Sequence, residues 1–221
     1  MGYIKSVNLT PVLDDTTELK GVNKDTDNFY AKFRMNALDA TIWTAATTGT
    51  ATVSLTNVSE KRFLTLAPTA STSTAGVDTL NKRFSKDDGA IEIKALVSLT
   101  TNLAAGGDNN MNFGIINGWA TGTNAIRLEI WADRLRFTTI KASTSTTVEK
   151  AIAATTGIFY NLRAVINSAW TEVKFYINDV LETTITTNIP DNVILNAYAM
   201  CYRHAATTGT GYCDSISVNK V

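Results

Sequence analysis

Apolar residues in this chain recur at every second position in short runs, and not at helical spacing. The clearest example is "YNLRAVINSAWTEVKFYINDVLETT", residues 160–184. Alternation with a period of two places the apolar side chains of a strand on one face, here the row that contains Phe175. Asn178 and Asp179 both tolerate the left-handed conformation of a tight turn. The segment therefore predicts antiparallel strands that pack one face on a core.

Similar runs continue along most of the chain, separated by clusters of Thr, Gly, Ser and Asn that are typical of loops. The sequence shows no sustained helical periodicity and no internal repeat of fixed length. The spacing predicts an all-β protein, a two-sheet antiparallel sandwich. Strands are expected at residues 40–46, 51–57, 61–66, 77–84, 90–100, 111–117, 125–131, 134–140, 157–167, 171–178, 181–187, 193–204 and 211–219.

The first part of the chain has a different character. Residues 1–36 are polar and irregular, with the clusters "LDDTTE" and "NKDTDN", and we interpret them as an N-terminal attachment arm on a sandwich of residues 37–221. A segment of this kind is ordered when a partner holds it. Phe29, Tyr30 and Phe33 are therefore expected to contact another subunit.

Composition and charge exclude several classes of partner. The 20 basic and 20 acidic residues cancel, and no basic cluster is present, so nucleic-acid binding is not expected. "MGYIKSVNLTP" lacks the apolar stretch of a secretory signal, and no run reaches about eighteen apolar residues, so a membrane partner is not expected either. Cys201 and Cys213 are expected to be free buried thiols, although a position facing each other across a hairpin stays open.

Four segments together resemble a known family. "AIEIKALV", "LEIWADRLRF", the run of residues 160–184 and the closing "CDSISVNKV" are similar to strands of the concanavalin A-like, laminin-G-like jelly roll. The resemblance covers about residues 40–221, with Asp179 where the family usually has Gly. It implies a jelly-roll sandwich and leaves the activity open, because lectins, glycanases, lyases, adhesion modules and virion proteins share this fold.

The segment that precedes these strands has a second resemblance. "LDATIWTAATTGTATVSLTNVSEKRFLTLAPTASTSTAGVDTLNKRFS" is similar to the opening of jelly-roll modules in tailed-phage structural proteins. The shared features are a Trp-bearing strand, a Gly/Thr turn, a strand ending in "LTLA", a Thr/Ser loop and a strand ending in "RF". This resemblance implies a virion component.

Two groups of residues offer enzymatic chemistry. Glu129, Trp131 and Asp133 share one face of a strand, and the glycanase branch of the family places two catalytic carboxylates on such a strand. Here the middle position is Trp and no third carboxylate follows. His204 is the sole histidine, and a lyase would need it, Tyr202 or Tyr212 as a base. Because side chains alternate along a strand, Tyr202 and His204 are expected on one face and Arg203 on the other. Neither catalytic set is therefore complete, and we predict that the chain is not an enzyme.

Metal and sugar sites require other side chains. "NKDTDN", "KDDGA" and "GGDNN" supply oxygen ligands but lack the pattern of a calcium loop, so no metal and no cofactor is expected. Sugar binding would use exposed aromatic rings. Trp119, in the Gly-rich loop "NGWATGTN", is the best candidate, with Trp131, Tyr202 and Tyr212 as companions.

These observations lead to three hypotheses. The first is a non-enzymatic structural protein of a tailed-phage virion, a capsid-decorating or appendage subunit that is assembled in the host cytoplasm and binds other virion proteins and copies of itself. The second is a carbohydrate-binding module for surface glycans, centred on Trp119. The third is a polysaccharide lyase or glycanase that uses Glu129 or Tyr202.

Overall fold

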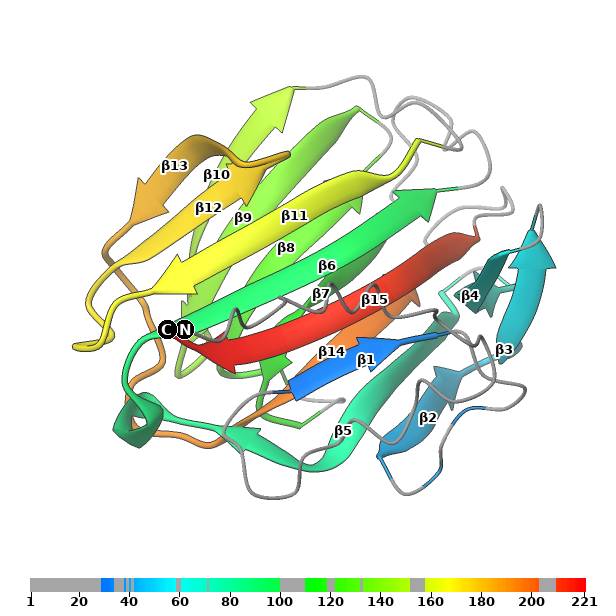
Figure 1. Ribbon diagram of the computed structural model, residues 1–221, viewed down its shortest axis with the longest axis horizontal. Coiled ribbons are helices and arrows are strands. Elements are labelled where there is room, and N and C mark those ends of the chain that lie inside the picture. The colour runs from blue at the N-terminus through cyan, green and yellow to red at the C-terminus, as the bar shows by residue number, and fades with distance from the viewer. Residues whose placement is uncertain are drawn as a thin grey trace, which may run out of the picture.

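The computed structural model describes residues 29–33, 38, 40, 42–58, 61–70, 72–99, 110–118, 122–131, 133–151, 158–202 and 210–221. Nearly all regular structure in these residues is β, as the sequence predicts, and it forms two layers (Figure 1). No helix in this part of the chain is long and apolar enough to cross a membrane.

The strands of the described residues, with one short 3₁₀ helix (η1), have the following bounds: β1 (Phe29–Lys32), β2 (Trp43–Thr48), β3 (Ala51–Val58), β4 (Lys61–Pro68), β5 (Thr74–Phe84), η1 (Lys86–Asp88), β6 (Ile91–Leu99), β7 (Asn110–Ile116), β8 (Ala125–Trp131), β9 (Arg134–Lys141), β10 (Thr144–Ala151), β11 (Tyr160–Ile166), β12 (Val173–Ile177), β13 (Val180–Ile185), β14 (Leu195–Tyr202) and β15 (Gly211–Lys220).

Two antiparallel sheets form a jelly-roll β-sandwich, which confirms the predicted fold class. One sheet has the order β13-β12-β11-β6-β15-β4-β3, with β1 paired to β15. The other has the order β10-β9-β8-β7-β14-β5-β2 and lies behind the first in Figure 1. Strands distant in sequence are neighbours in both sheets, β6 with β15 and β7 with β14. The position of a site in this fold therefore depends on pairings that no short segment reveals.

The predicted hairpin of residues 160–178 is confirmed. Ala164 of β11 lies opposite Phe175 of β12, and both are fully buried. The φ angles of Asn178 and Asp179 are 47° and 66°, the left-handed values of a two-residue turn. Phe175 stacks on Phe137 of the opposite sheet, with 5.2 Å between ring centroids. This pair joins the two layers of the sandwich.

The predicted arm partly belongs to the sandwich. The backbone of β1 pairs with β15, and Phe33 directly after it is only 4% exposed. Phe33 packs against Trp43 of β2, with ring centroids 5.5 Å apart. Its expected role at an interface is therefore corrected, because the core already covers its ring. Residues 1–28 and the side chains of Phe29 and Tyr30 lie outside the described residues.

One strand was not predicted from the sequence, and the two cysteines lie on different sheets. Strand β10 was not predicted, because "TSTTVEKA" is polar on both faces and shows no alternation. Cys201 lies on β14 and Cys213 on β15, in different sheets, so they do not face each other across a hairpin. Both are free and buried.

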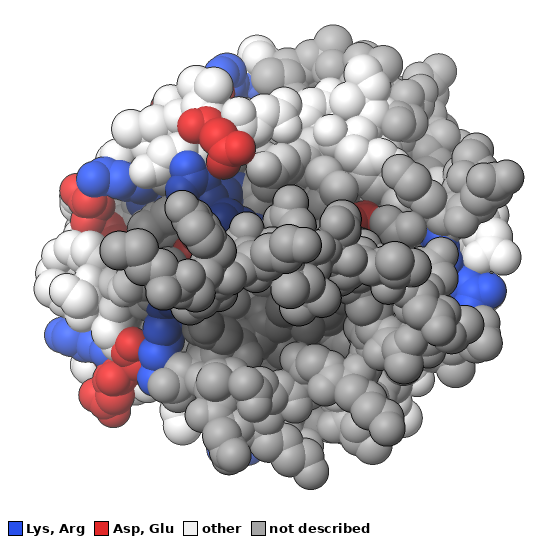
Figure 2. Space-filling model, in the orientation of Figure 1, with Lys and Arg blue, Asp and Glu red and all other residues white. Residues whose placement is uncertain are grey.

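Charges of both signs are mixed on the face of the eight-stranded sheet. Figure 2 shows Lys and Arg interspersed with Asp and Glu toward the edge that carries β11, β12 and β13. Arg163 Nη1 lies 3.2 Å from Glu92 Oε1, and Lys174 Nζ lies 3.2 Å from Glu172 Oε1. This edge therefore offers no field of a single sign to a charged partner.

Replacing Phe175 by Ala should lower the free energy of unfolding by about 3–5 kcal/mol, because it leaves a cavity where Phe137 now stacks. The adjacent Lys174→Ala, on the opposite face of β12, should change it by less than about 0.5 kcal/mol. Urea unfolding followed by tryptophan fluorescence measures both. Equal effects of the two substitutions would contradict this assignment of faces.

The two thiols should be unreactive in the folded protein. Burial raises the pKa of Cys201 to about 12, and burial, followed by the nearby Asp214, raises the pKa of Cys213 as well. Iodoacetamide at pH 8 should modify neither residue under native conditions and both after unfolding in urea, as read by mass spectrometry. Rapid modification of the native protein would show that one strand end opens.

Candidate functional site

An open hollow of about 480 Å³ lies on the outer face of the seven-stranded sheet. It arises from the alternation of β8, in which Ile126, Leu128 and Ile130 face the core and the residues between them face outward. The neighbouring strands β7, β9 and β14 alternate in the same way. The lining residues are Asn110, Asn112, Arg127, Glu129, Trp131, Arg136, Met200 and Tyr202.

Strand register arranges these side chains in three rows across the sheet. The middle row is Met200, Asn112, Glu129, Arg136 and Glu149. The Trp131 row, on one side, is Tyr202, Asn110 and Trp131. The Gly114 row, on the other side, is Asp78, Tyr198, Gly114, Arg127 and Thr138.

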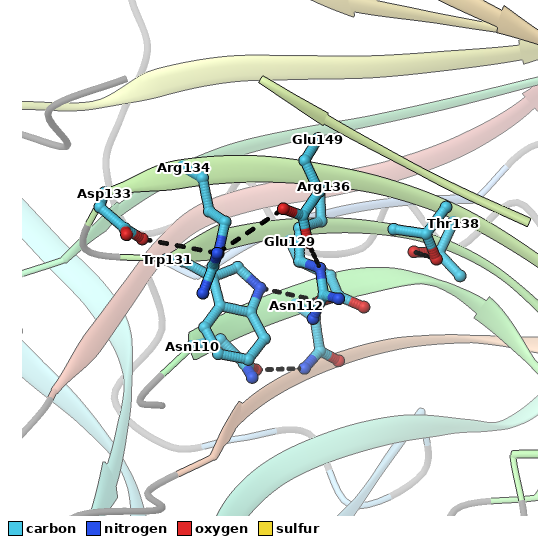
Figure 3. A network of polar contacts seen from close by, with 10 residues as sticks. Asn110, Asn112, Glu129, Trp131, Asp133, Arg134, Arg136, Thr138 and Glu149 are labelled. Atoms are coloured by element: carbon cyan, nitrogen blue, oxygen red, sulfur yellow. Dashed lines mark hydrogen bonds and ion pairs between the residues drawn. The ribbon is translucent and has the colours of Figure 1, made fainter. Parts of the chain in front are cut away.

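Glu129 is the centre of the polar network in the hollow (Figure 3). It is 7% exposed, and its Oε2 accepts a hydrogen bond of 2.9 Å from the indole Nε1 of Trp131. Arg136 Nη1 lies 4.0 Å from the same oxygen, and Arg136 Nε lies 2.7 Å from Glu149 Oε1. The carboxylate of Glu129 is therefore oriented by one hydrogen bond from the indole, with the positive charge of Arg136 close to the same oxygen.

The Trp131 row is built from planar groups. The Trp131 ring is 7% exposed, with the guanidinium carbons of Arg136 and Arg134 4.8 and 5.3 Å from its centroid. Beside it, Asn112 Nδ2 donates a hydrogen bond of 2.8 Å to Asn110 Oδ1. These contacts orient the indole and both amides before any ligand arrives.

The Gly114 row contains a position that only glycine can occupy. Gly114 has φ 146°, and a Cβ there would lie 2.0 Å from the carbonyl oxygen of Ile126. Tyr198 and Arg127 pair directly with Gly114 from either side. Burial raises the pKa of Tyr198 far above its ordinary value, while the positive charge of Arg127 acts in the opposite direction. Its phenol therefore remains protonated at neutral pH.

The structure brings some predicted residues together and separates others. Glu129, Trp131 and Tyr202 all line the hollow. Asp133 lies beyond the end of β8, its side chain is 48% exposed, and its Oδ1 lies 3.5 Å from Arg134 Nε. Tyr212 lies on the eight-stranded sheet, where it stacks on Phe63 with 5.8 Å between ring centroids. Tyr212 is therefore not a companion of Trp131.

The remaining candidates give no further site. Trp119, Arg203 and His204 lie outside the described residues. Asp88 accepts a hydrogen bond from the backbone N–H of Ser85 and pairs with Lys220, so it stabilises a turn. Among the residues that the structure describes, no group of three His, Cys, Asp or Glu side chains could hold a metal ion.

Sequence reasoning missed most of the lining. It treated Asn110 as part of a loop and did not select Asn112, Arg127, Arg136 or Met200. Each is an outward position of a strand, so alternation within "MNFGII", "AIRLEIW" and "RLRFTTI" contained the signal. Alternation does not reveal the order in which these strands pair, so it could not show that these residues lie together.

The comparisons with known proteins concern the fold. No family model matches the chain, and no curated protein matches it in sequence. Among solved structures it is similar to an endo-1,3-beta-glucanase from Streptomyces sioyaensis, at 14% identity and a TM-score of 0.66, over 87% of this chain and 96% of that one. A glycoside hydrolase family 16 endo-glucanase from Bacteroides ovatus gives 14% and 0.65, over 86% and 99%. The carbohydrate recognition domain of Emp46p gives 10% and 0.59, over 80% and 88%.

These neighbours show that the fold is a concanavalin A-like jelly-roll β-sandwich, as the first resemblance implied. They give no support to the tailed-phage resemblance, to virion partners or to assembly with copies of itself. The prediction that the chain is not an enzyme is corrected, because several of the solved structures that share its fold are glycanases.

Proposed function

We propose that the hollow on the seven-stranded sheet binds a carbohydrate chain. The observation that carries the proposal is its lining, in which two amides, two guanidiniums, an indole and a phenol lie on one open sheet face. Sugars present hydroxyl groups that both donate and accept, and planar polar side chains recognise them with paired hydrogen bonds. The fold supports the same assignment, since its neighbours include glucanases and a carbohydrate recognition domain.

An unpaired hydrogen-bond acceptor in the lining also supports a ligand that carries hydroxyl groups. Asn112 is 3% exposed, and its Oδ1 has no hydrogen-bond partner among the described residues. Leaving a buried acceptor unpaired costs about 1–3 kcal/mol. A sugar hydroxyl that donated to this oxygen would remove that cost, whereas an apolar ligand would not.

Asn112→Ala should weaken binding of the recognised oligosaccharide about tenfold, since it removes one acceptor and one donor from the floor of the hollow. Ser145→Ala, an exposed change on β10 outside the hollow, is the matched control and should leave affinity unchanged. Calorimetry with neutral and acidic oligosaccharides measures both, with thermal unfolding as a check of the fold. If the unaltered protein binds none of them, the proposal is wrong.

Glycoside hydrolysis is a second candidate, favoured by the glucanase neighbours and by the position of Glu129 in the hollow. Retaining hydrolysis requires a second carboxyl group about 5–5.5 Å from the first. Asp133 follows Glu129 at the end of the same strand and is the residue that could supply it after moving away from Arg134.

For this candidate, the protein should release reducing ends from a β-glucan or another polysaccharide. Glu129→Gln should lower the rate by about a hundredfold or more, while Glu149→Gln, at the edge of the middle row, should have a far smaller effect. Binding without any release of reducing ends would contradict hydrolysis and leave carbohydrate binding in place.

A further inference from the structure

Arg127 differs from the other arginine of the hollow because it forms no ion pair with any residue that the structure describes. Arg136 lies 2.7 Å from Glu149 and 4.0 Å from Glu129. Arg127 makes no hydrogen bond or ion pair with any described residue. A partly buried cation that lacks an anion is costly, so its presence in a hollow calls for an explanation.

The surroundings of Arg127 are polar, but no described carboxylate pairs with it, and Glu129, two residues along the same strand, accepts its hydrogen bond from Trp131. Tyr198, across Gly114, is fully buried, and its hydroxyl has no hydrogen-bond partner among the described residues. Because its pKa is raised, it stays neutral beside the guanidinium. Asp78 pairs with Tyr198 from its other side, three strands from Arg127. At the usual strand spacing this is about 14 Å, too far for an ion pair.

The position of the guanidinium is defined by two glycines. Gly114 lies between Arg127 and Tyr198 in the register and lets the backbone of β8 approach closely, since a Cβ there would lie 2.0 Å from the carbonyl oxygen of Ile126. On the other side, a Cβ added to Gly122 would lie 2.6 Å from Arg127 Nη2, so the side chain packs closely against the loop that contains Gly122. Asn112, one row away on β7, lines the same hollow, and its Oδ1 has no partner among the described residues.

The hollow balances the charge of one of its two arginines, because Arg136 pairs with Glu149, and leaves Arg127 without an ion pair among the described residues. Its lining contains two arginines and one carboxylate, and that carboxylate is held by Trp131 and Arg136. A neutral sugar would leave the charge of Arg127 unpaired. A ligand with a carboxylate or sulfate group would pair with it, and a guanidinium binds both groups through two parallel hydrogen bonds.

We infer that the hollow takes an acidic glycan, with Arg127 binding the carboxylate of a uronic acid or a sulfate ester and Asn112 accepting a hydrogen bond from a hydroxyl group nearby. This inference rests on the proposed carbohydrate binding and assigns the class of sugar. Uronates and sulfated sugars share the chemistry that Arg127 recognises, so the experiment contains one arm for each.

The test compares oligosaccharides of equal length by calorimetry at low salt: a neutral glucan, a uronate and a sulfated sugar. The unaltered protein should bind at least one acidic ligand about tenfold or more tightly than the neutral one, and the preference should shrink in 0.5 M salt, at which the screening length is about 4 Å. Arg127→Gln should abolish the preference.

Three further variants make the result specific. Lys141→Gln removes the same charge outside the hollow and should leave the preference intact. Arg136→Gln should weaken the binding of neutral and acidic ligands by the same factor. Arg127→Lys retains the charge without the planar guanidinium and should give an intermediate preference for acidic over neutral sugars. If Arg127→Gln does not fold, this reduced preference in Arg127→Lys tests the role of Arg127 in its place.

The outcomes separate the two proposals. Equal affinity for neutral and acidic sugars, or a preference that survives Arg127→Gln, overturns the inference and leaves carbohydrate binding standing. Failure to bind every sugar overturns both. Tighter binding of the sulfated sugar than of the uronate assigns the anion to a sulfate ester, and the reverse order assigns it to a carboxylate.

Discussion

The structure depends on strict alternation in the central strands of the seven-stranded sheet. In β8, Ile126, Leu128 and Ile130 are fully buried in the core, and every residue between them faces the hollow. A slip of one residue would exchange the two sets and place Arg127 and Glu129 between the sheets. Burying these charges without partners would cost more than the core can supply, so the packing of the core also determines the register of the site.

This coupling means that the sheet itself sets the arrangement of side chains in the hollow. Its side chains project from paired strands, which hold functional groups more accurately than loops do. Within it, Trp131 and Arg136 orient Glu129, and Asn112 orients Asn110. The Gly114 row is the exception, because Arg127 and Tyr198 have no such partners among the described residues. The described groups of the hollow that lack partners therefore lie in the Gly114 row and at Asn112 in the middle row.

Local alternation was sufficient to predict the sandwich and the hairpin of residues 160–178, because both depend on neighbours in sequence. The strand β10 was missed since neither of its faces is apolar. Phe33 was assigned to an arm because it lies at the end of a polar and irregular stretch, whereas its packing partner Trp43 is ten residues away. Prediction from sequence failed wherever the decisive contact was not local.

The site shows the same limit more clearly. Asn112, Arg127 and Met200 meet only because β7 pairs with both β8 and β14, and strand order is not encoded in any one segment. Glu129, Trp131 and Tyr202 were selected for their chemistry, and the fold brought them together. Nothing in the alternation could distinguish a paired arginine from an unpaired one.

The burial of Trp131 changes the expected mode of sugar recognition. The sequence suggested aromatic rings exposed for stacking, but this indole is 7% exposed, lies close to two guanidiniums and donates its N–H to Glu129. Its role in the structure is to orient Glu129 and support Arg136. The surface that remains for a ligand consists mainly of amide and guanidinium edges, which form directed hydrogen bonds. Such a surface distinguishes sugars by the charge and placement of their polar groups more than by the flat faces that all pyranose rings share.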